Sequence, residues 1–147
     1  MPAAVTDHVV GALPLLPEER RPGAPLAPRR LGRSFSAAFG GLAHLLRAEP
    51  NAQLHCALAL LTTGLAIWLG LTPVEWAVLM ALFGLVIGLE AINTAIEGLA
   101  DLAMPHRDPR VATIKDVAAG GVLAGALAAA TAGFCLFGPR LLRLLGS

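Results

Sequence analysis

Charge is scarce in this sequence. Only 14% of its 147 residues are Asp, Glu, Lys or Arg, whereas 56% are hydrophobic, and the mean hydropathy is +0.69. The 16 glycines raise the apolar share to roughly two-thirds, against about half in an ordinary soluble domain. A single domain of this length cannot bury so many apolar side chains in a water-soluble core. We therefore predict a small all-α integral membrane protein.

Other features that the sequence lacks narrow its class further. A net charge of +1, with no basic patch interleaved with aromatic residues, argues against disorder and against a nucleic-acid partner. The two cysteines, Cys56 and Cys135, lie in apolar runs, which indicates small buried residues and not a disulfide framework. The first long apolar segment begins only near residue 52, which argues against a secretory signal.

The N-terminal region differs in composition from the rest. Residues 1–32 include six of the eleven prolines and several arginines, so we predict a flexible cytoplasmic tail there and one membrane domain over 33–147. That domain opens with a predicted amphipathic helix over 33–48, expected to lie in the membrane interface. Its apolar positions recur at intervals of three and four residues: Phe35, Ala38, Phe39, Leu42, Leu45 and Leu46.

Lys and Arg are absent between Arg47 and Arg107, a gap long enough for two membrane crossings. The Thr72-Pro73 step interrupts the gap and predicts a turn, because proline cannot continue the first helix. We therefore predict membrane helices over about 52–71 and 74–103, and a third apolar run predicts another over about 114–137.

The basic residues indicate an orientation. Six arginines lie at or before Arg47, and the 105–115 loop carries three more basic residues, so the positive-inside rule places both segments in the cytoplasm. Three crossings then place the C-terminus outside. Arg140 and Arg143, near that C-terminus, count against this orientation.

One stretch of the second membrane helix is not explained by hydrophobicity. At about 100° per residue, the offsets i, i+3, i+7 and i+11 return close to the same angle, so the side chains at these positions form one stripe. Carboxylates at membrane depth are costly and usually face a polar cavity. We expect the stripe to run from the cytoplasmic half of the membrane to its inner interface. It consists of Glu90, Asn93, Glu97 and Asp101.

Further polar groups are expected at the same depth. Glu49 precedes the first membrane helix, and Lys115-Asp116 open the third, where an anion would meet the positive end of the helix dipole. Carboxylates beside a lysine suit a metal–phosphate complex, because Mg²⁺ is typically held by one or two carboxylates plus substrate phosphates. The sequence has no Walker-type or kinase-type glycine loop, so a known soluble nucleotide-binding fold is excluded.

Other interpretations stay open at this point. The stripe could serve as protonated structural contacts between helices, and a structural role explains His55 as well as a functional one does. A non-enzymatic cation-binding or transport protein is the alternative of another class, but it predicts acids along the whole path across the bilayer. The spacings Gly84-x-x-x-Gly88 and Gly121-x-x-x-Gly125 predict close helix contacts and an oligomer.

The sequence resembles the prokaryotic diacylglycerol kinase family, small three-helix membrane kinases that include undecaprenol kinases. Three motifs over about residues 33–137 carry the resemblance. The pattern Glu-x-x-Asn-Thr-Ala-Ile-Glu-x-x-x-Asp starts at Glu90, and Lys-Asp-x-Ala-Ala-Gly-x-Val-Leu starts at Lys115. Gly41-Leu42 and then Glu49-x-Asn51-x-x-x-His55 form the third. Arg107-Asp108 depart from the Tyr-His that is common in the family.

The resemblance implies an ATP-dependent kinase of a membrane lipid alcohol, with Mg²⁺ as cofactor. It also implies a multi-pass homotrimer in the cell's inner (plasma) membrane, with active sites between subunits at the cytoplasmic face. The Glu-x-Asn-x-x-x-His element looks more like the undecaprenol kinases, so undecaprenol is favoured as substrate. A diacylglycerol kinase that makes phosphatidic acid is the alternative.

The resemblance also implies a role for each site residue. Glu90 would be the general base, Asn93 would orient the reacting groups, and Glu49 and Glu97 would hold the metal. Residues implied in ATP binding are Arg30, Glu49, Glu97, His106, Arg107, Asp108, Lys115 and Asp116. Residues implied in substrate binding or support are Arg33, Asn51, His55 and Asp101.

Overall fold

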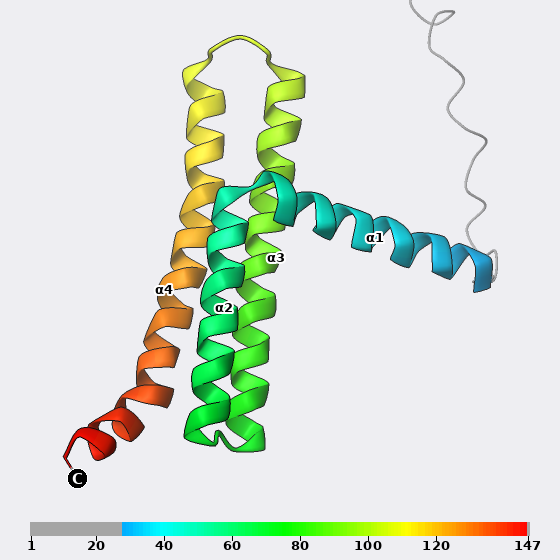
Figure 1. Ribbon diagram of the computed structural model, residues 1–147. Helices are drawn as coiled ribbons and strands as arrows, with labels where there is room; N and C mark the ends of the chain where they lie inside the picture. Colours follow the sequence, from blue (N-terminus) through cyan, green and yellow to red (C-terminus); the bar gives the residue numbers. More distant parts are fainter. Residues whose placement is uncertain (1–27, 147) are drawn as a thin grey trace, which may run out of the picture. The chain divides into compact units, whose positions relative to one another are not determined.

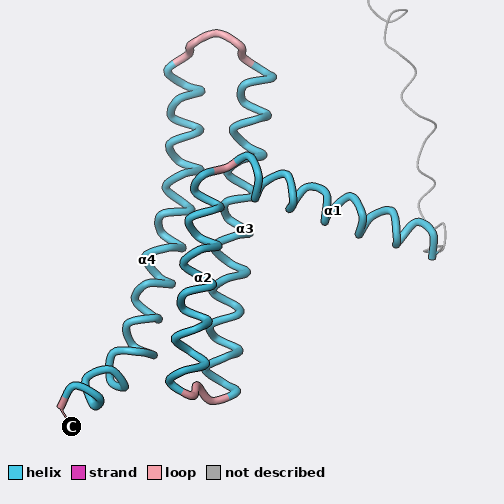
Figure 2. The backbone as a smooth tube through the Cα atoms, viewed as in Figure 1, coloured by secondary structure: helices cyan, strands magenta, loops and turns pink. Residues whose placement is uncertain are grey.

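The computed structural model describes residues 28–146, and in that range the chain forms four α-helices without a strand (Figures 1 and 2). Most of the predicted tail, residues 1–27, lies outside the described residues. The chain divides into two compact units, Met1–Ser36 and Ala37–Ser147. The candidate site belongs to the second unit. The helices are α1 (Pro28–Ala48), α2 (Pro50–Leu69), α3 (Pro73–Ala103) and α4 (Pro109–Leu145).

Three helices, α2, α3 and α4, are long and apolar enough to cross a membrane, which confirms the predicted all-helical class and number of candidate spans. The ends of α2 and α3 lie within two residues of the predicted ones. Helix α1 begins at Pro28, five residues before the predicted start at 33, and proline is well tolerated in the first turn of a helix. Its position in the membrane interface and the trimer stay predictions.

The last helix differs most from the prediction of 114–137. It begins at Pro109, since Asp108 caps it and proline is well tolerated in the first turn of a helix. It also continues past Pro139 to Leu145, because an internal proline removes one backbone donor and bends a helix without always ending it. Figure 1 shows the C-terminal end of α4 turning away from α2 after this point.

A tight turn joins α2 to α3. Gly70 ends α2 with φ +66°, a left-handed conformation that glycine adopts without steric cost, and Leu71 N–H donates to Ala66 O at 3.2 Å. Thr72 then caps α3 in a capping box: its backbone N–H donates to Glu75 Oε2 (2.8 Å), and Glu75 N–H donates to Thr72 Oγ1 (3.4 Å). The turn lies where it was predicted, and Pro73, on which that prediction rested, is the first residue of α3.

Helices α3 and α4 pack side by side, and α2 packs mainly on α3 (Figure 1). Of the predicted small-residue contacts, Gly125 permits a close approach, because a Cβ there would lie 2.5 Å from Leu89 Cδ1. A Cβ on Gly84, Gly88 or Gly121 would meet nothing within 4 Å, so these glycines make no such contact within the chain. The prediction was wrong for those three as contacts inside one chain.

The helices α3 and α4 extend well past the start of α2 and carry the loop between them (Figure 1). The 31 residues of α3 span about 46 Å at 1.5 Å per residue, whereas the hydrocarbon core of a bilayer is about 30 Å thick. The extra length places the last turns of α3 and the first turns of α4 beyond the part that is paired with α2. The candidate site lies where the paired part ends.

Candidate functional site

Burial decreases along the polar stripe of α3. Glu90 is only 2% exposed and Asn93 8%, while Glu97 is half-buried and Asp101 is exposed. A buried polar side chain is costly unless it has a partner or a function. Among the described residues, Glu90 Oε1 and Asn93 Oδ1 are buried without a hydrogen-bond partner. These two atoms mark the inner end of the stripe as the place where a ligand would complete the hydrogen bonding.

The stripe makes a specific contact with α2 and another within α3. His55 Nε2 of α2 lies 3.6 Å from Glu90 Oε1, so the first membrane helix brings its only histidine to the most buried carboxyl. One turn further along α3, Asn93 Nδ2 donates a hydrogen bond to Glu97 Oε1 at 2.8 Å. The amide therefore fixes the orientation of Glu97 and turns its own unpartnered oxygen toward the buried region.

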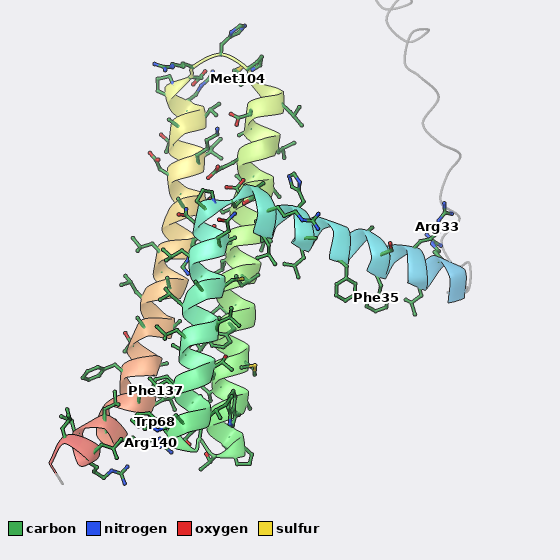
Figure 3. The ribbon with its side chains drawn as sticks, viewed as in Figure 1. Arg33, Phe35, Trp68, Met104, Phe137 and Arg140 are labelled. Atoms are coloured by element: carbon green, nitrogen blue, oxygen red, sulfur yellow. The ribbon has the colours of Figure 1, made fainter. Side chains whose placement is uncertain are left out.

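At the outer end of the stripe, α3 meets α4 through charge. Lys115 Nζ donates to Asp101 Oδ1 at 2.5 Å, across the gap between the two helices. Beside this pair is a pocket of about 520 Å³ that is lined by the α3–α4 loop and the adjoining turns of both helices, near Met104 in Figure 3. It brings together five residues that the sequence singled out: Asp101, His106, Arg107, Asp108 and Lys115.

Asp108 organises this loop. Its Oδ1 accepts from the backbone N–H of Arg110 (2.8 Å), which caps α4, and its Oδ2 accepts from the Arg110 guanidinium (2.8 Å). The Arg110 side chain, and then the Arg110 backbone N–H, lower the pKa of Asp108 below its ordinary value. The carboxylate is thus ionised and engaged within the loop, which leaves His106 and Arg107 as its exposed polar side chains.

The remaining predicted residues lie in three places. Glu49 is half-buried and is the N-cap residue of α2, yet its side chain makes no capping hydrogen bond, while Asn51 is exposed in the first turn. Asp116 is exposed beside Lys115 on α4. Arg30 and Arg33 belong to the first unit and are exposed. Their predicted roles stay predictions.

The residues predicted to hold a metal do not form a closed protein cage. Within residues 28–146, no group of three or more His, Cys, Asp or Glu side chains gathers closely enough to bind a metal ion by itself. The donor chemistry still suits Mg²⁺, which usually keeps waters and takes one or two carboxylates together with substrate phosphates. Glu49 and Glu97 offer that kind of ligand.

Sequence reasoning missed an apolar groove that starts at His55. The groove has a volume of about 670 Å³, within the range of small-molecule sites, and runs between α2, α3 and α4. Among the described residues that line it, Thr62 is the only other one with a hydrogen-bonding side chain. Thr62 donates to the backbone oxygen of Leu58 (2.7 Å) and so leaves the surface apolar. Small residues on one face of α4 leave space for the groove. Their spacing in the sequence could have predicted it: Ala126, Ala129, Ala130 and Gly133.

Sequence reasoning also missed an ion pair at the other end of the bundle. Arg140 donates from both terminal nitrogens to Glu75, with two contacts of 2.8 Å, and also to Leu136 O. Figure 3 shows Arg140 at the end of α4 opposite to Met104. Glu75 therefore balances the charge of Arg140, one of the two arginines that counted against the predicted orientation.

Comparison with known proteins places these features in a family context. Residues 36–137 match the family described as prokaryotic diacylglycerol kinase. An undecaprenol kinase of Bacillus subtilis is 34% identical over 112 residues, which cover 76% of this chain and 91% of that protein. A diacylglycerol kinase of Synechocystis sp. is 36% identical over 113 residues, which cover 76% of this chain and 65% of that protein.

Proposed function

This chain belongs to the prokaryotic diacylglycerol kinase family, and we propose that it transfers the γ-phosphate of Mg-ATP to the hydroxyl of undecaprenol. Membership of this family makes the chain an ATP-dependent lipid kinase and argues against the alternative of a non-enzymatic cation transporter. One observation carries the proposal for the site. The buried carboxyl of Glu90 lies where an apolar groove, through His55, meets a polar stripe that leads to the loop pocket.

Glu90 is the general base in this proposal. A lipid hydroxyl is a poor nucleophile until a positioned base removes its proton, and Glu90 Oε1 is a buried oxygen without a hydrogen-bond partner among the described residues. Phosphoryl transfer otherwise needs positioning and charge stabilisation more than covalent chemistry. Asn93 serves that need, because it holds Glu97 and presents its free amide oxygen beside Glu90.

The nucleotide is proposed to occupy the loop pocket. Lys115, His106 and Arg107 supply positive or hydrogen-bonding groups there, and Asp101 holds the Lys115 ammonium in place. Glu49 and Glu97 are proposed to hold Mg²⁺ on the phosphates, where the ion supplies positive charge to the transferring group. Asp116, Asn51, Arg30 and Arg33 keep their predicted supporting or binding roles in this proposal.

The apolar groove is proposed to hold the hydrocarbon chain of the substrate. The hydroxyl end of the lipid substrate would then lie at His55, within reach of Glu90, and its hydrocarbon part would lie along α4 as far as Leu141. From Ala126 to Leu141 a helix rises about 22 Å, a length along which an extended hydrocarbon chain can lie. The likeness to the Bacillus subtilis undecaprenol kinase favours a polyprenol over diacylglycerol.

A membrane homotrimer is part of the proposal. Many large apolar side chains point outward from this one chain, among them Leu60 (75% exposed) and Phe134 (77%), so lipid or further copies must cover them. Gly84, Gly88 and Gly121, which have open space around them, suit contacts between copies. We place the loop pocket and the N-terminus at the cytoplasmic face of the inner (plasma) membrane, since the basic residues gather there.

The proposal is tested with the full-length protein in mixed micelles. The purified protein is incubated with Mg-ATP and equal mole fractions of undecaprenol and diacylglycerol, and both phosphorylated products are quantified. We expect undecaprenyl phosphate to form with the higher kcat/KM. Preferential formation of phosphatidic acid would favour the diacylglycerol kinase alternative, and the absence of both products would contradict the proposed function.

A further inference from the structure

The reaction proposed above leaves a proton on a buried group. Once Glu90 has taken the hydroxyl proton, its carboxyl is neutral, and only 2% of the residue is exposed. Glu90 Oε1 has no hydrogen-bond partner within residues 28–146 through which this proton could leave. The carboxyl must be deprotonated again before the next turnover. Steady catalysis therefore requires a second group that accepts the proton from Glu90.

His55 is the group in position to do so. Of the side chains that the structure describes, it is the only basic one within ion-pair distance of Glu90, with 3.6 Å between Nε2 and Oε1. The neighbouring Asn93 directs its amide N–H to Glu97 instead. Helix α4 contributes only apolar side chains to the groove at His55, so Glu90 of α3 is the ionisable group that faces the imidazole.

We propose that His55 is a proton relay that regenerates Glu90 after each phosphoryl transfer, an inference that rests on the proposed kinase function. In the first step the lipid O–H bond breaks and its proton bonds to Glu90 Oε1. The lipid oxygen bonds to the γ-phosphorus, the bond from that phosphorus to the bridging oxygen breaks, and ADP leaves. In the second step the Glu90 O–H bond breaks and an N–H bond forms at His55 Nε2. The imidazolium then loses the proton on Nδ1 to water, which leaves Glu90 ionised and His55 as the Nε2–H tautomer. Proton exchange with water returns His55 to the Nδ1–H tautomer before the next turnover.

The geometry and chemistry of His55 suit this step. Its side chain is 19% exposed, against 3% for the side chain of Glu90, so it connects the buried carboxyl to a more open region. A neutral imidazole accepts a proton on one nitrogen and releases one from the other. A distance of 3.6 Å exceeds a hydrogen bond of about 2.7–3.2 Å, so a small side-chain rotation must close it.

Two rates measured on the full-length protein distinguish a relay from a structural role. Wild type, His55→Gln and a matched control, His44→Gln on an exposed histidine of α1, are mixed rapidly with Mg-ATP and undecaprenol in micelles. The first turnover needs only Glu90 as base, whereas later turnovers need its deprotonation. For His55→Gln we expect a normal burst of about one product per chain, followed by a steady rate at least ten-fold below wild type. The control should match wild type in both phases.

Each other outcome overturns the relay. A steady rate within two-fold of wild type would show that Glu90 loses its proton without His55, and a first turnover slowed as much as the steady rate would indicate a structural role. His55→Ala with added imidazole gives a second readout, because a small base should restore the steady rate and not change the burst. A wild-type protein that phosphorylates no lipid would contradict the proposed function instead.

Discussion

Glu90 is the residue on which the proposed chemistry depends most directly. It is buried on α3, faces His55 and keeps one oxygen free of hydrogen bonds among the described residues. A carboxyl held there without a catalytic role would be a net cost to the fold, because burying a polar group without a partner is unfavourable. Its position therefore argues for function independently of the family resemblance.

Replacing Glu90 with Gln should remove turnover without removing the nucleotide. The amide keeps the size of the side chain but cannot accept a proton, so we expect kcat to fall by about 10²–10⁴-fold. The affinity for ATP, measured by equilibrium binding, should stay within two-fold of wild type, since the loop pocket lies at the far end of the stripe. Glu75→Gln, on the same helix and distant from the site, is the matched control. Near-normal turnover of purified Glu90→Gln would remove Glu90 from the role of base.

At the residue scale, the spacing of the polar residues predicted which side chains share one face of α3, but not which residues they contact. The intervals between Glu90, Asn93, Glu97 and Asp101 were enough to place them on one stripe, because helix geometry is local. The partners of that stripe were not predictable in the same way. That His55 contacts Glu90 and Lys115 contacts Asp101 depends on how three helices pack, which no spacing within one segment encodes.

Among the elements, the α3–α4 loop owes its shape to Asp108. The side chain accepts from the Arg110 backbone and from its guanidinium, and these two contacts start α4 five residues before the predicted position. The prediction of 114 followed the beginning of the apolar run. Hydropathy marks where a helix enters lipid, whereas capping marks where the helix begins, and the two differ when a helix extends into water.

The Asp108 interactions predict a specific dependence of stability on pH. Because the folded protein lowers the pKa of Asp108 below its ordinary 3.8, the ionised carboxylate stabilises the fold above that pH. The contribution is lost as the pH falls through the lower folded pKa. Asp108→Asn keeps a good capping residue but loses the charge, so it should have a lower Tm in detergent than wild type at pH 7.

This difference should have a defined pH profile. The gap in Tm between wild type and Asp108→Asn should stay constant from pH 7 to about pH 4 and narrow only below 3.8. Asp108→Ala, which loses the cap as well, should be less stable than Asp108→Asn throughout. A gap that already closes between pH 7 and pH 5 would mean that another group, and not Asp108, is responsible.

At the scale of the whole molecule, charged side chains of the second unit form ion pairs at both ends of the α3–α4 pair. One end of the α3–α4 pair carries the stripe and the loop pocket, and the other end carries the Glu75–Arg140 pair (Figure 3). The groove between them is lined almost entirely by apolar side chains. Composition could predict a membrane protein, but not that ion pair, because 65 residues separate its members and only packing brings them together.

The Glu75–Arg140 pair should act on stability and not on catalysis. It ties α4, just beyond its internal Pro139, to the start of α3, and both side chains are mostly shielded, at 22–23% exposed. Arg140→Glu places two carboxylates together, so we expect the Tm in detergent to fall by several degrees, with the KM for ATP unchanged. Adding Glu75→Arg restores opposite charges and should recover part of the loss. Recovery stays partial because Glu75 also completes the capping box with Thr72. If the two substitutions were simply additive in a double-mutant cycle, the pair would not be coupled and the end of α4 would be held by its apolar contacts alone.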